Sequence, residues 1–198
     1  YRDGKVKVWA DEGDGFDIIG LVQDTIYTRI KHQSIVRVIG DSLVPLPGGE
    51  FFKEIKINGF LPYQKNKLLI ATRKDGFFLY EAGQINALKT EADDYLKKYF
   101  IYDTRQLPDG GYVIATLQGG VVLFDADLRV KQIIDETSGL PANGVNAVFV
   151  DNNFNLWLGH SYHGITRIEL HTPLTILNAT SGINGRVKQM LRYNGILY

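Results

Sequence analysis

Short runs of apolar residues alternate with polar turns along the chain, and three of these runs recur at a fixed spacing. Leu69–Thr72, Val113–Thr116 and Trp157–His160 begin 44 residues apart. Short apolar runs bounded by Gly, Asn and Asp predict β-strands rather than helices. Each run is followed by a polar turn, a glycine and a further run of strand type; the glycines are Gly76, Gly120 and Gly164. A period of this size built from strands predicts a β-propeller with one four-stranded blade per repeat.

The clearest repeat predicts four antiparallel strands, which cover residues 145–150, 156–160, 165–170 and 175–179. Asp151–Asn155 predicts the turn between the first two strands, because Asp and Asn tolerate left-handed backbone and bond their own main chain. The charged segment Lys89–Lys98 predicts a helical turn. The repeat nearest the N-terminus is less regular, but it still predicts strands over 16–22, 25–29, 34–39 and 43–46.

We therefore expect an all-β fold made of a single β-propeller segment with four-stranded antiparallel blades. The expected complete blades span residues 9–50, 51–98, 99–137 and 138–180, and partial blades span 1–8 and 181–198. A propeller ring must close, because an end blade otherwise leaves a strand edge and an apolar face bare. We thus expect about four complete and two partial blades of a larger ring.

The composition narrows the classes of function. Lys and Arg together number 22, as do Asp and Glu, so the formal net charge is zero. This balance gives no support to a nucleic-acid partner or to an anionic membrane surface. The chain has no Cys, which excludes disulfides and thiolate chemistry. No apolar run approaches the roughly 18 residues of a transmembrane helix.

No catalytic constellation is visible in the sequence, and we expect no cofactor, no metal and no enzymatic activity in this segment. His160 and His163 could hold a metal, but no acidic or Cys partner lies at ligand spacing, so exposed turn histidines are the expected alternative. Asp151–Asn155 resembles a calcium loop for two residues and then lacks the remaining oxygen ligands. The carboxylate pairs Asp93/Asp94 and Asp125/Asp127 fit solvated surface better than acid–base chemistry. Trp157 fits packing between blades, with sugar stacking as the alternative.

The expected ligand site follows from position alone. In a propeller, the links between blades and the turns between second and third strands emerge on one face near the central channel. A small-molecule site needs donors, acceptors and an aromatic or apolar surface, and these loops carry such side chains. The candidate ligand-binding residues are Arg73, Gln118, Asn143, His160, Tyr162, His163 and Arg186.

One stretch of the chain resembles a known family. Ser138–Asn143, the Val-led strand that follows, Asp151, Asn155–Gly159 and Gly164–Ile165 resemble the two-component regulator propeller repeat. That repeat reads roughly Gly-Leu-Pro-x-Asn, a strand, Asp-x-x-Gly-x-Leu-Trp-Ile-Gly-Thr and Gly-Leu. Here Asn155 replaces the turn glycine and His160 replaces the threonine. The resemblance weakens over residues 55–127 and is faint before residue 50.

The resemblance implies a function. Such propellers, typically of seven blades, form the periplasmic sensor of bacterial sensor histidine kinases and hybrid two-component regulators, and their ligands are often oligosaccharides. It implies a small-molecule ligand, the remainder of the propeller and a second copy of the receptor as partners. Because of the charge balance, we expect no nucleic acid to be bound by this segment. Two alternatives stay open. One is a protein-interaction scaffold. The other is a propeller lyase or lactonase, which only His160 and His163 support.

Overall fold

The computed structural model describes residues 7–9, 15–170, 192–193 and 196–197. Its strands form four main sheets. The first sheet holds β1 (Phe16–Val22), β2 (Thr25–Ile30), β3 (Ser34–Ile39) and β4 (Ser42–Pro45). The second holds β5 (Ile57–Tyr63), β6 (Lys67–Thr72), β7 (Phe77–Glu81) and β8 (Gln84–Leu88). The third holds β9 (Ile101–Gln106), β10 (Tyr112–Thr116), β11 (Val121–Phe124) and β12 (Val130–Ile134). In the fourth, β13 (Ala147–Val150), β14 (Asn155–Gly159) and β15 (Ile165–Glu169) are described.

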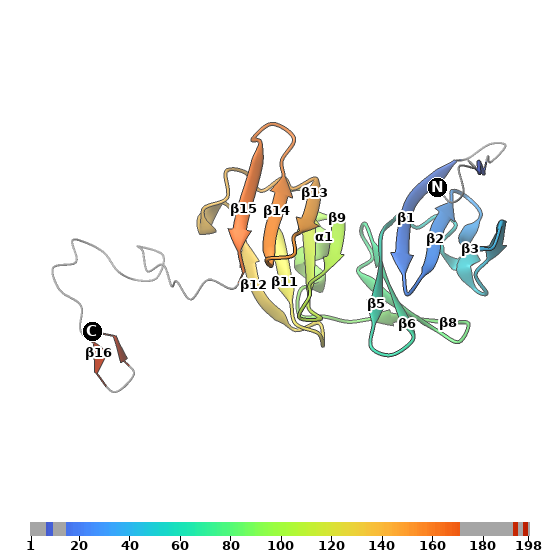
Figure 1. The fold of residues 1–198 in the computed structure, drawn as a ribbon, viewed down its shortest axis with the longest axis horizontal. Helices are drawn as coiled ribbons and strands as arrows, with labels where there is room; N and C mark the ends of the chain where they lie inside the picture. Colours follow the sequence, from blue (N-terminus) through green and yellow to red (C-terminus); the bar gives the residue numbers. More distant parts are fainter. Residues whose placement is uncertain (1–6, 10–14, 171–191, 194–195, 198) are drawn as a thin grey trace.

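Every sheet is an antiparallel meander in chain order, and successive sheets follow one another in space (Figure 1). The opening strands β1, β5, β9 and β13 lie next to one another along the inside of this arc. The expectation of an all-β propeller with four-stranded antiparallel blades is confirmed. We call the sheets the first to fourth blades.

A few short elements complete the chain. Two 3₁₀ turns, Gly49–Phe52 and Glu136–Ser138, and helix α1 (Asp93–Tyr99) lie in the links between blades. A hairpin of β16 (Arg192–Tyr193) and β17 (Ile196–Leu197) is also present. The expected outer strand 175–179 lies outside the described residues, as do most of the expected partial blades 1–8 and 181–198.

The glycines that repeat every 44 residues mark the same turn in three blades. Their φ angles are 77° at Gly76, 71° at Gly120 and 72° at Gly164. This left-handed region is open to glycine and strained for most other residues. In each turn the glycine carbonyl accepts a hydrogen bond from the backbone of the last residue of the run; the donors are Thr72 at 3.0 Å, Thr116 at 2.9 Å and His160 at 2.9 Å. The sequence repeat is therefore a repeat of turn geometry.

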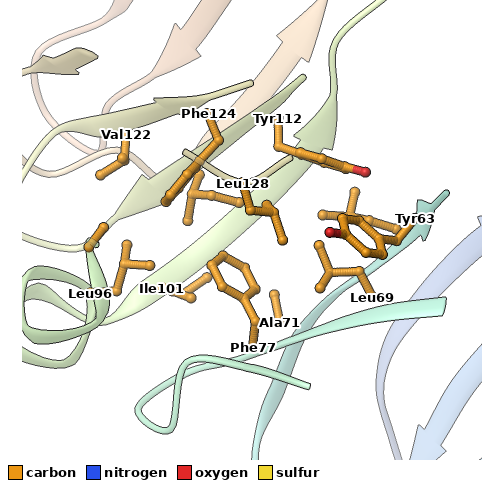
Figure 2. Close-up of a cluster of buried hydrophobic side chains, with 13 residues drawn as sticks. Tyr63, Leu69, Ala71, Phe77, Leu96, Ile101, Tyr112, Val122, Phe124 and Leu128 are labelled. Atoms are coloured by element: carbon orange, nitrogen blue, oxygen red, sulfur yellow. The ribbon is translucent and has the colours of Figure 1, made fainter. Parts of the chain in front are cut away.

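Apolar clusters fill the space between successive blades. Between the second and third blades, the rings of Phe77 and Phe124 meet edge to face with centroids 5.9 Å apart. Figure 2 shows these rings with Ile101 from β9 and Leu96 from α1 converging on the same core. The Tyr112 hydroxyl crosses the interface and donates to the carbonyl of Pro62 at 2.9 Å. Burial of such side chains stabilises each interface by roughly 1.5–3 kcal/mol per side chain.

The opening strands approach one another closely. A Cβ added at Gly59 of β5 would lie 1.9 Å from Thr104 Oγ1 of β9. The Asn58 side-chain amide donates to the carbonyl of Tyr102 at 2.8 Å, which joins the same two strands. Further along, the backbone N–H of Val148 donates to the Asp103 carboxylate at 2.8 Å. Contacts made by side chains, and the absence of a side chain at Gly59, thus replace a regular ladder of backbone hydrogen bonds between these strands.

The close approach predicts that Gly59→Ala destabilises the protein by about 1–3 kcal/mol, because the added methyl overpacks the junction of β5 and β9. Thr104→Ala removes the nearest atom, so Gly59→Ala should cost less in that background. Urea unfolding of the two single variants and the double variant measures this coupling. Equal costs of Gly59→Ala in both backgrounds would contradict the proposed clash.

Because the Tyr112 side chain is buried, we expect the protein to lose stability at alkaline pH. Burial, and to a smaller extent the neighbouring Tyr63, raises the pKa of Tyr112 to about 12. The pKa of an unfolded tyrosine is about 10, so the stabilising contribution of the neutral phenol is complete below about pH 10. It is then lost as the pH rises towards about 12. Tyr112→Phe should be less stable near neutral pH by about 1 kcal/mol, through loss of the bond to Pro62, and should show a flatter stability profile above pH 10.

Urea unfolding at a series of alkaline pH values checks this expectation. Tyr162→Phe serves as the control, since Tyr162 is almost fully exposed. The pH profile of Tyr162→Phe should match that of the wild type. A wild-type slope that Tyr112→Phe leaves unchanged would show that other groups cause the alkaline loss.

Candidate ligand-binding face

Two kinds of loop meet on one face of the blades. The backbone N–H of Arg73, in the turn after β6, donates to the carbonyl of Lys56, in the link before β5, at 2.8 Å. The same bond joins Leu117 to Phe100 in the third blade at 3.1 Å. In the fourth blade the donor lies in the link: Asn146 bonds Gly159 at 2.9 Å. Links between blades and turns between second and third strands therefore share one surface, which we call the loop face.

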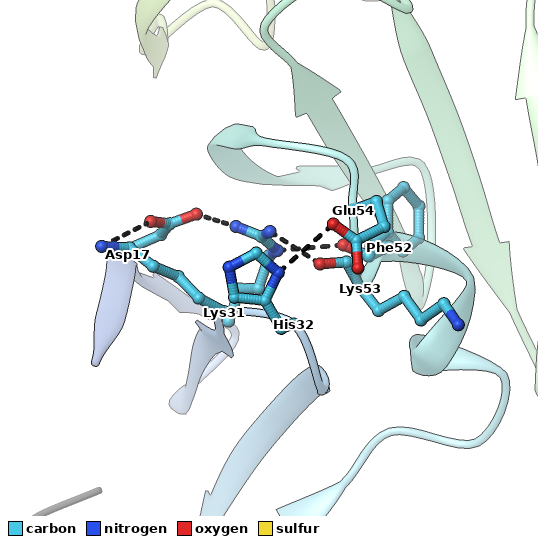
Figure 3. Close-up of polar contacts among 7 residues, drawn as sticks. Asp17, Lys31, His32, Phe52, Lys53 and Glu54 are labelled. Carbon is cyan, nitrogen blue, oxygen red and sulfur yellow. Dashed lines mark hydrogen bonds and ion pairs between the residues drawn. The ribbon is translucent and has the colours of Figure 1, made fainter. Parts of the chain in front are cut away.

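A polar lock fixes the link between the first and second blades (Figure 3). The Arg29 guanidinium pairs with Asp17, and their side chains are 5% and 6% exposed. Arg29 also donates to the carbonyls of Phe52 and Lys53, each at 2.9 Å. Burial lowers the pKa of Arg29, and the nearby Glu54 carboxylate opposes this shift. Because a buried ion pair needs such extra hydrogen bonds, we interpret the lock as positioning the link rather than binding a ligand.

Four of the candidate residues present unused side chains on the loop face. Arg73 is half-buried, and Gln118, Tyr162 and His163 are exposed. Tyr162 is 93% exposed. Within the described part of the chain, none of these four side chains forms a hydrogen bond or an ion pair. They are therefore available to a ligand.

Asn143 forms hydrogen bonds within the link between the third and fourth blades. Its side-chain oxygen accepts from the backbone N–H of Glu136 at 2.8 Å, and its backbone N–H donates to the Glu136 carboxylate at 3.0 Å. Its carbonyl accepts from Gly120 at 2.7 Å. Asn143 thus closes the 135–143 loop on itself and on the turn of the third blade.

His160 is buried, with 8% of its surface exposed, so the expectation of an exposed turn histidine is wrong at this position. Its Nδ1 lies 2.9 Å from the carbonyl of Gly144, and its Nε2 lies 3.0 Å from Thr166 Oγ1. The first contact requires Nδ1 to donate, and Nε2 then accepts from the hydroxyl. His160 occupies the place of Thr72 and Thr116, whose hydroxyls bond within their own turns. The larger imidazole instead ties the turn to the link. The seventh candidate, Arg186, lies outside the described residues.

Trp157 lies on the side of the fourth blade that faces away from the third. Its indole N–H donates to Asp151 at 2.8 Å, and the Arg167 guanidinium lies 5.9 Å from its ring centre. The hydrogen bond from Trp157, followed by that from Asn155, lowers the pKa of Asp151 to about 2. The Asp151 carboxylate also accepts from the backbone of Asn153 and Asn155, each at 2.9 Å. The role of the Asp151 carboxylate is therefore to accept the hydrogen bonds that form this turn, and no calcium ion is needed to explain its position.

Sequence reasoning missed an aromatic group that α1 places on the loop face. The Tyr95 hydroxyl donates to the carbonyl of Gly119 at 2.6 Å, and the ring of Tyr99 packs on Tyr95 with centroids 4.6 Å apart. The Lys74 ammonium lies 5.2 Å from the centre of the Phe100 ring. The signal was present in the three aromatic residues of segment 95–100. The charged residues of the same segment predict a helical turn and carry no sign of its aromatic face.

A hollow lies on the channel side of the opening strands. Its volume is about 360 Å³, and β1, β5 and β9 line it. More than half of its wall is polar, and the polar side chains that line it are Asn58, Thr104, Arg105 and Gln106. Among the described residues, no group of three His, Cys, Asp or Glu side chains could hold a metal. Over the same residues, no helix has the length and apolar character needed to cross a membrane.

The burial of His160 predicts that His160→Ala lowers the free energy of unfolding by about 1–3 kcal/mol, because the carbonyl of Gly144 and the hydroxyl of Thr166 both lose a partner. His160→Thr should cost less, because threonine can restore the turn bonds of Thr72 and Thr116. The control is His163→Ala, an exposed position whose effect should stay within about 0.5 kcal/mol. Urea unfolding compares the three variants. Equal stability of His160→Ala and His163→Ala would refute the structural role.

No protein-family model matches the sequence, and a search of curated proteins gives no significant match. The structure is nevertheless similar to solved structures. One is the extracellular domain of a protein described as a hybrid two-component system, BT3049 from B. thetaiotaomicron, with a TM-score of 0.66 and 14% identity. The similarity covers 84% of this chain and 23% of that chain.

A second similar structure is the extracellular domain of BT4673 from the same organism, also described as a hybrid two-component system. Its TM-score is 0.59 with 18% identity, and the match covers 93% of this chain and 28% of that chain. A third is PorZ, a surface component of the type-IX secretion system of Porphyromonas gingivalis, with a TM-score of 0.55, 11% identity, and coverage of 78% and 26%. This chain spans about a quarter of the length of these structures. At such identities the similarity establishes the propeller fold.

Proposed function

We propose that this chain is part of the ligand-sensing propeller of a bacterial two-component regulator, placed in the periplasm and binding a carbohydrate on its loop face. The segment acts as a receptor and not as an enzyme. The observation that carries the proposal is the set of unused polar and aromatic side chains at Arg73, Gln118, Tyr162 and His163, which all lie in turns of the loop face. Saccharides are recognised by such donors and acceptors next to aromatic rings.

The similar structures support the class of function, since two of them are extracellular domains of proteins described as two-component systems. The Gly-Leu-Pro-x-Asn and Leu-Trp-Leu-Gly stretches of the sequence support the same family. A receptor must also hold a second state with a different ligand affinity. We propose that this state differs in how two copies of the receptor pair.

A protein-interaction scaffold is the second candidate. It is favoured by the hairpin of β14 and β15, where Tyr162 and Ile165 are 93% and 74% exposed within one short stretch. Exposed aromatic and aliphatic side chains in one place are typical of protein contacts. Stable capture of a defined protein partner through this hairpin, with no saccharide binding, would favour the scaffold.

The sensor proposal predicts that Tyr162→Ala combined with His163→Ala weakens saccharide binding at least about tenfold, by removing a stacking ring and a hydrogen-bonding group. Stability should change by less than about 0.5 kcal/mol per site. Titration calorimetry with oligosaccharides that raise the melting temperature of the wild type measures the affinity.

The matched control is Asn152→Ala combined with Asn153→Ala, two exposed positions in the β13–β14 turn at the other end of the same strands. This control should bind like the wild type. Unchanged affinity in the Tyr162 and His163 variant would contradict the placement of the site. A gene product lacking both a membrane helix and a kinase, cyclase or DNA-binding module would contradict the sensor proposal itself.

A further inference from the structure

Three positively charged residues of the second blade and its entry link lie on the loop face, where the turn after β6 meets the start of β9. Lys56 ends the link before β5, and Arg73 opens the turn after β6, with their backbones joined at 2.8 Å. Lys74 follows Arg73, and its ammonium lies 5.2 Å from the centre of the Phe100 ring. The carbonyl of Arg73 also accepts from Ile101 at 3.1 Å, which fixes the turn against the start of β9. The cations are thus held on a rigid junction.

Among the described residues, no carboxylate pairs with these cations. Within the described residues, the side chains of Lys56, Arg73 and Lys74 form no ion pair and no hydrogen bond. The nearby Asp17 is 6% exposed and is taken by Arg29 and Lys31. A group of charges of one sign on one face attracts ions of the opposite sign, so these cations are a candidate site for an external anion.

The other acidic residues of the junction do not remove the excess charge. Glu54 lies 3.2 Å from His32 Nδ1 and acts on the Arg29 guanidinium, and Asp93, beside Gly76, pairs with Lys89. Asp75 is exposed in the same turn and contributes one negative charge against the three positive ones. The turn 73–76 together with Lys56 therefore keeps a net positive charge.

The cations also disfavour one another. Partial burial lowers the pKa of Lys56, and the positive charges of Arg73, Lys31 and Arg29 lower it further. A bound anion would reduce this repulsion. The junction is therefore better suited to an occupied state than to an empty one.

We propose that Lys56, Arg73 and Lys74 bind an anionic group of the ligand, a carboxylate or a sulfate ester, so that the ligand is an acidic oligosaccharide. This inference rests on the ligand-binding function proposed above and narrows its ligand class. The Arg73 guanidinium can form two parallel hydrogen bonds to either group. The half-buried ring of Phe100 offers an apolar face beside the charge. A sugar ring that carries its acid group next to an apolar face matches this arrangement.

The test measures binding to the full chain by titration calorimetry with three probes: a trimer of galacturonic acid, galactose carrying one sulfate ester, and a neutral trimer of galactose. The test variant is Lys56→Gln combined with Arg73→Gln. We expect at least one acidic probe to bind the wild type about tenfold or more tightly than the neutral trimer. The test variant should lose this advantage. Added salt should weaken acidic binding in the wild type and have little effect in the variant.

The matched control is Lys65→Gln combined with Arg129→Gln, which removes the same charge from exposed turns outside the loop face. This control should keep the wild-type preference for acidic probes. Unfolding curves show whether each variant is folded. If the test variant fails to fold, Lys56→Arg combined with Arg73→Lys, which keeps the charges but changes their geometry, should bind the acidic probe more weakly than the wild type.

The outcomes separate this inference from the function beneath it. Saccharide binding in which neutral and acidic probes are equal, or in which the test variant and control behave alike, overturns the anion site and leaves the sensor proposal intact. Preference between the two acidic probes identifies the anionic group. Absence of all saccharide binding overturns the sensor proposal and the saccharide-bound anion site together. In that case, a thermal shift with inorganic sulfate that the test variant loses would show that the cations bind anions without a sugar.

Discussion

Face-to-face packing of successive sheets is the interaction on which every other feature of this chain depends. A sheet in this arrangement has two apolar faces, and each face is buried by the neighbouring blade. In β10, Tyr112 and Ile114 enter the cluster shared with the second blade, whereas Val113 and Ala115 enter the cluster shared with the fourth. All four are essentially inaccessible to solvent. This two-sided burial explains why the strand has an uninterrupted apolar sequence instead of an alternating one.

In the fourth blade, the described residues bury one face of the sheet. Val148 and Leu156, on the side facing the third blade, are 2% and 0% exposed, whereas Phe149 and Ile165 on the other side are 63% and 74% exposed. The first blade shows a similar asymmetry, because Ile19 is 72% exposed. Rigid packing within the arc holds the loops in place, so the loop face inherits its shape from the cores beneath it.

The fold could be predicted from the sequence because equivalent turns in successive blades each contain a glycine at the same spacing. Even the irregular first blade has strands where alternation predicted them, over 16–22 and 34–39. The site was less accessible. Turn position suggested that Asn143 and His160 face a ligand, but both side chains bond the protein's own backbone. Such contacts join segments that are adjacent in space, and spacing along the chain does not reveal which partner a polar side chain chooses.

The bonds between blades recur with the same spacing as the sequence. Ile101 donates to the carbonyl of Arg73, and Val145 donates to the carbonyl of Thr116, so that donors 44 residues apart find nearly equivalent acceptors in the preceding blade. Each blade thus presents backbone acceptors at nearly equivalent positions to the blade that follows it. Duplication or loss of one whole repeat would recreate these junctions without a new contact, whereas an insertion within the strands would shift the donors away from their acceptors. The unit of evolutionary change in this architecture is therefore the entire blade, and a ring of this kind grows or shrinks by whole repeats.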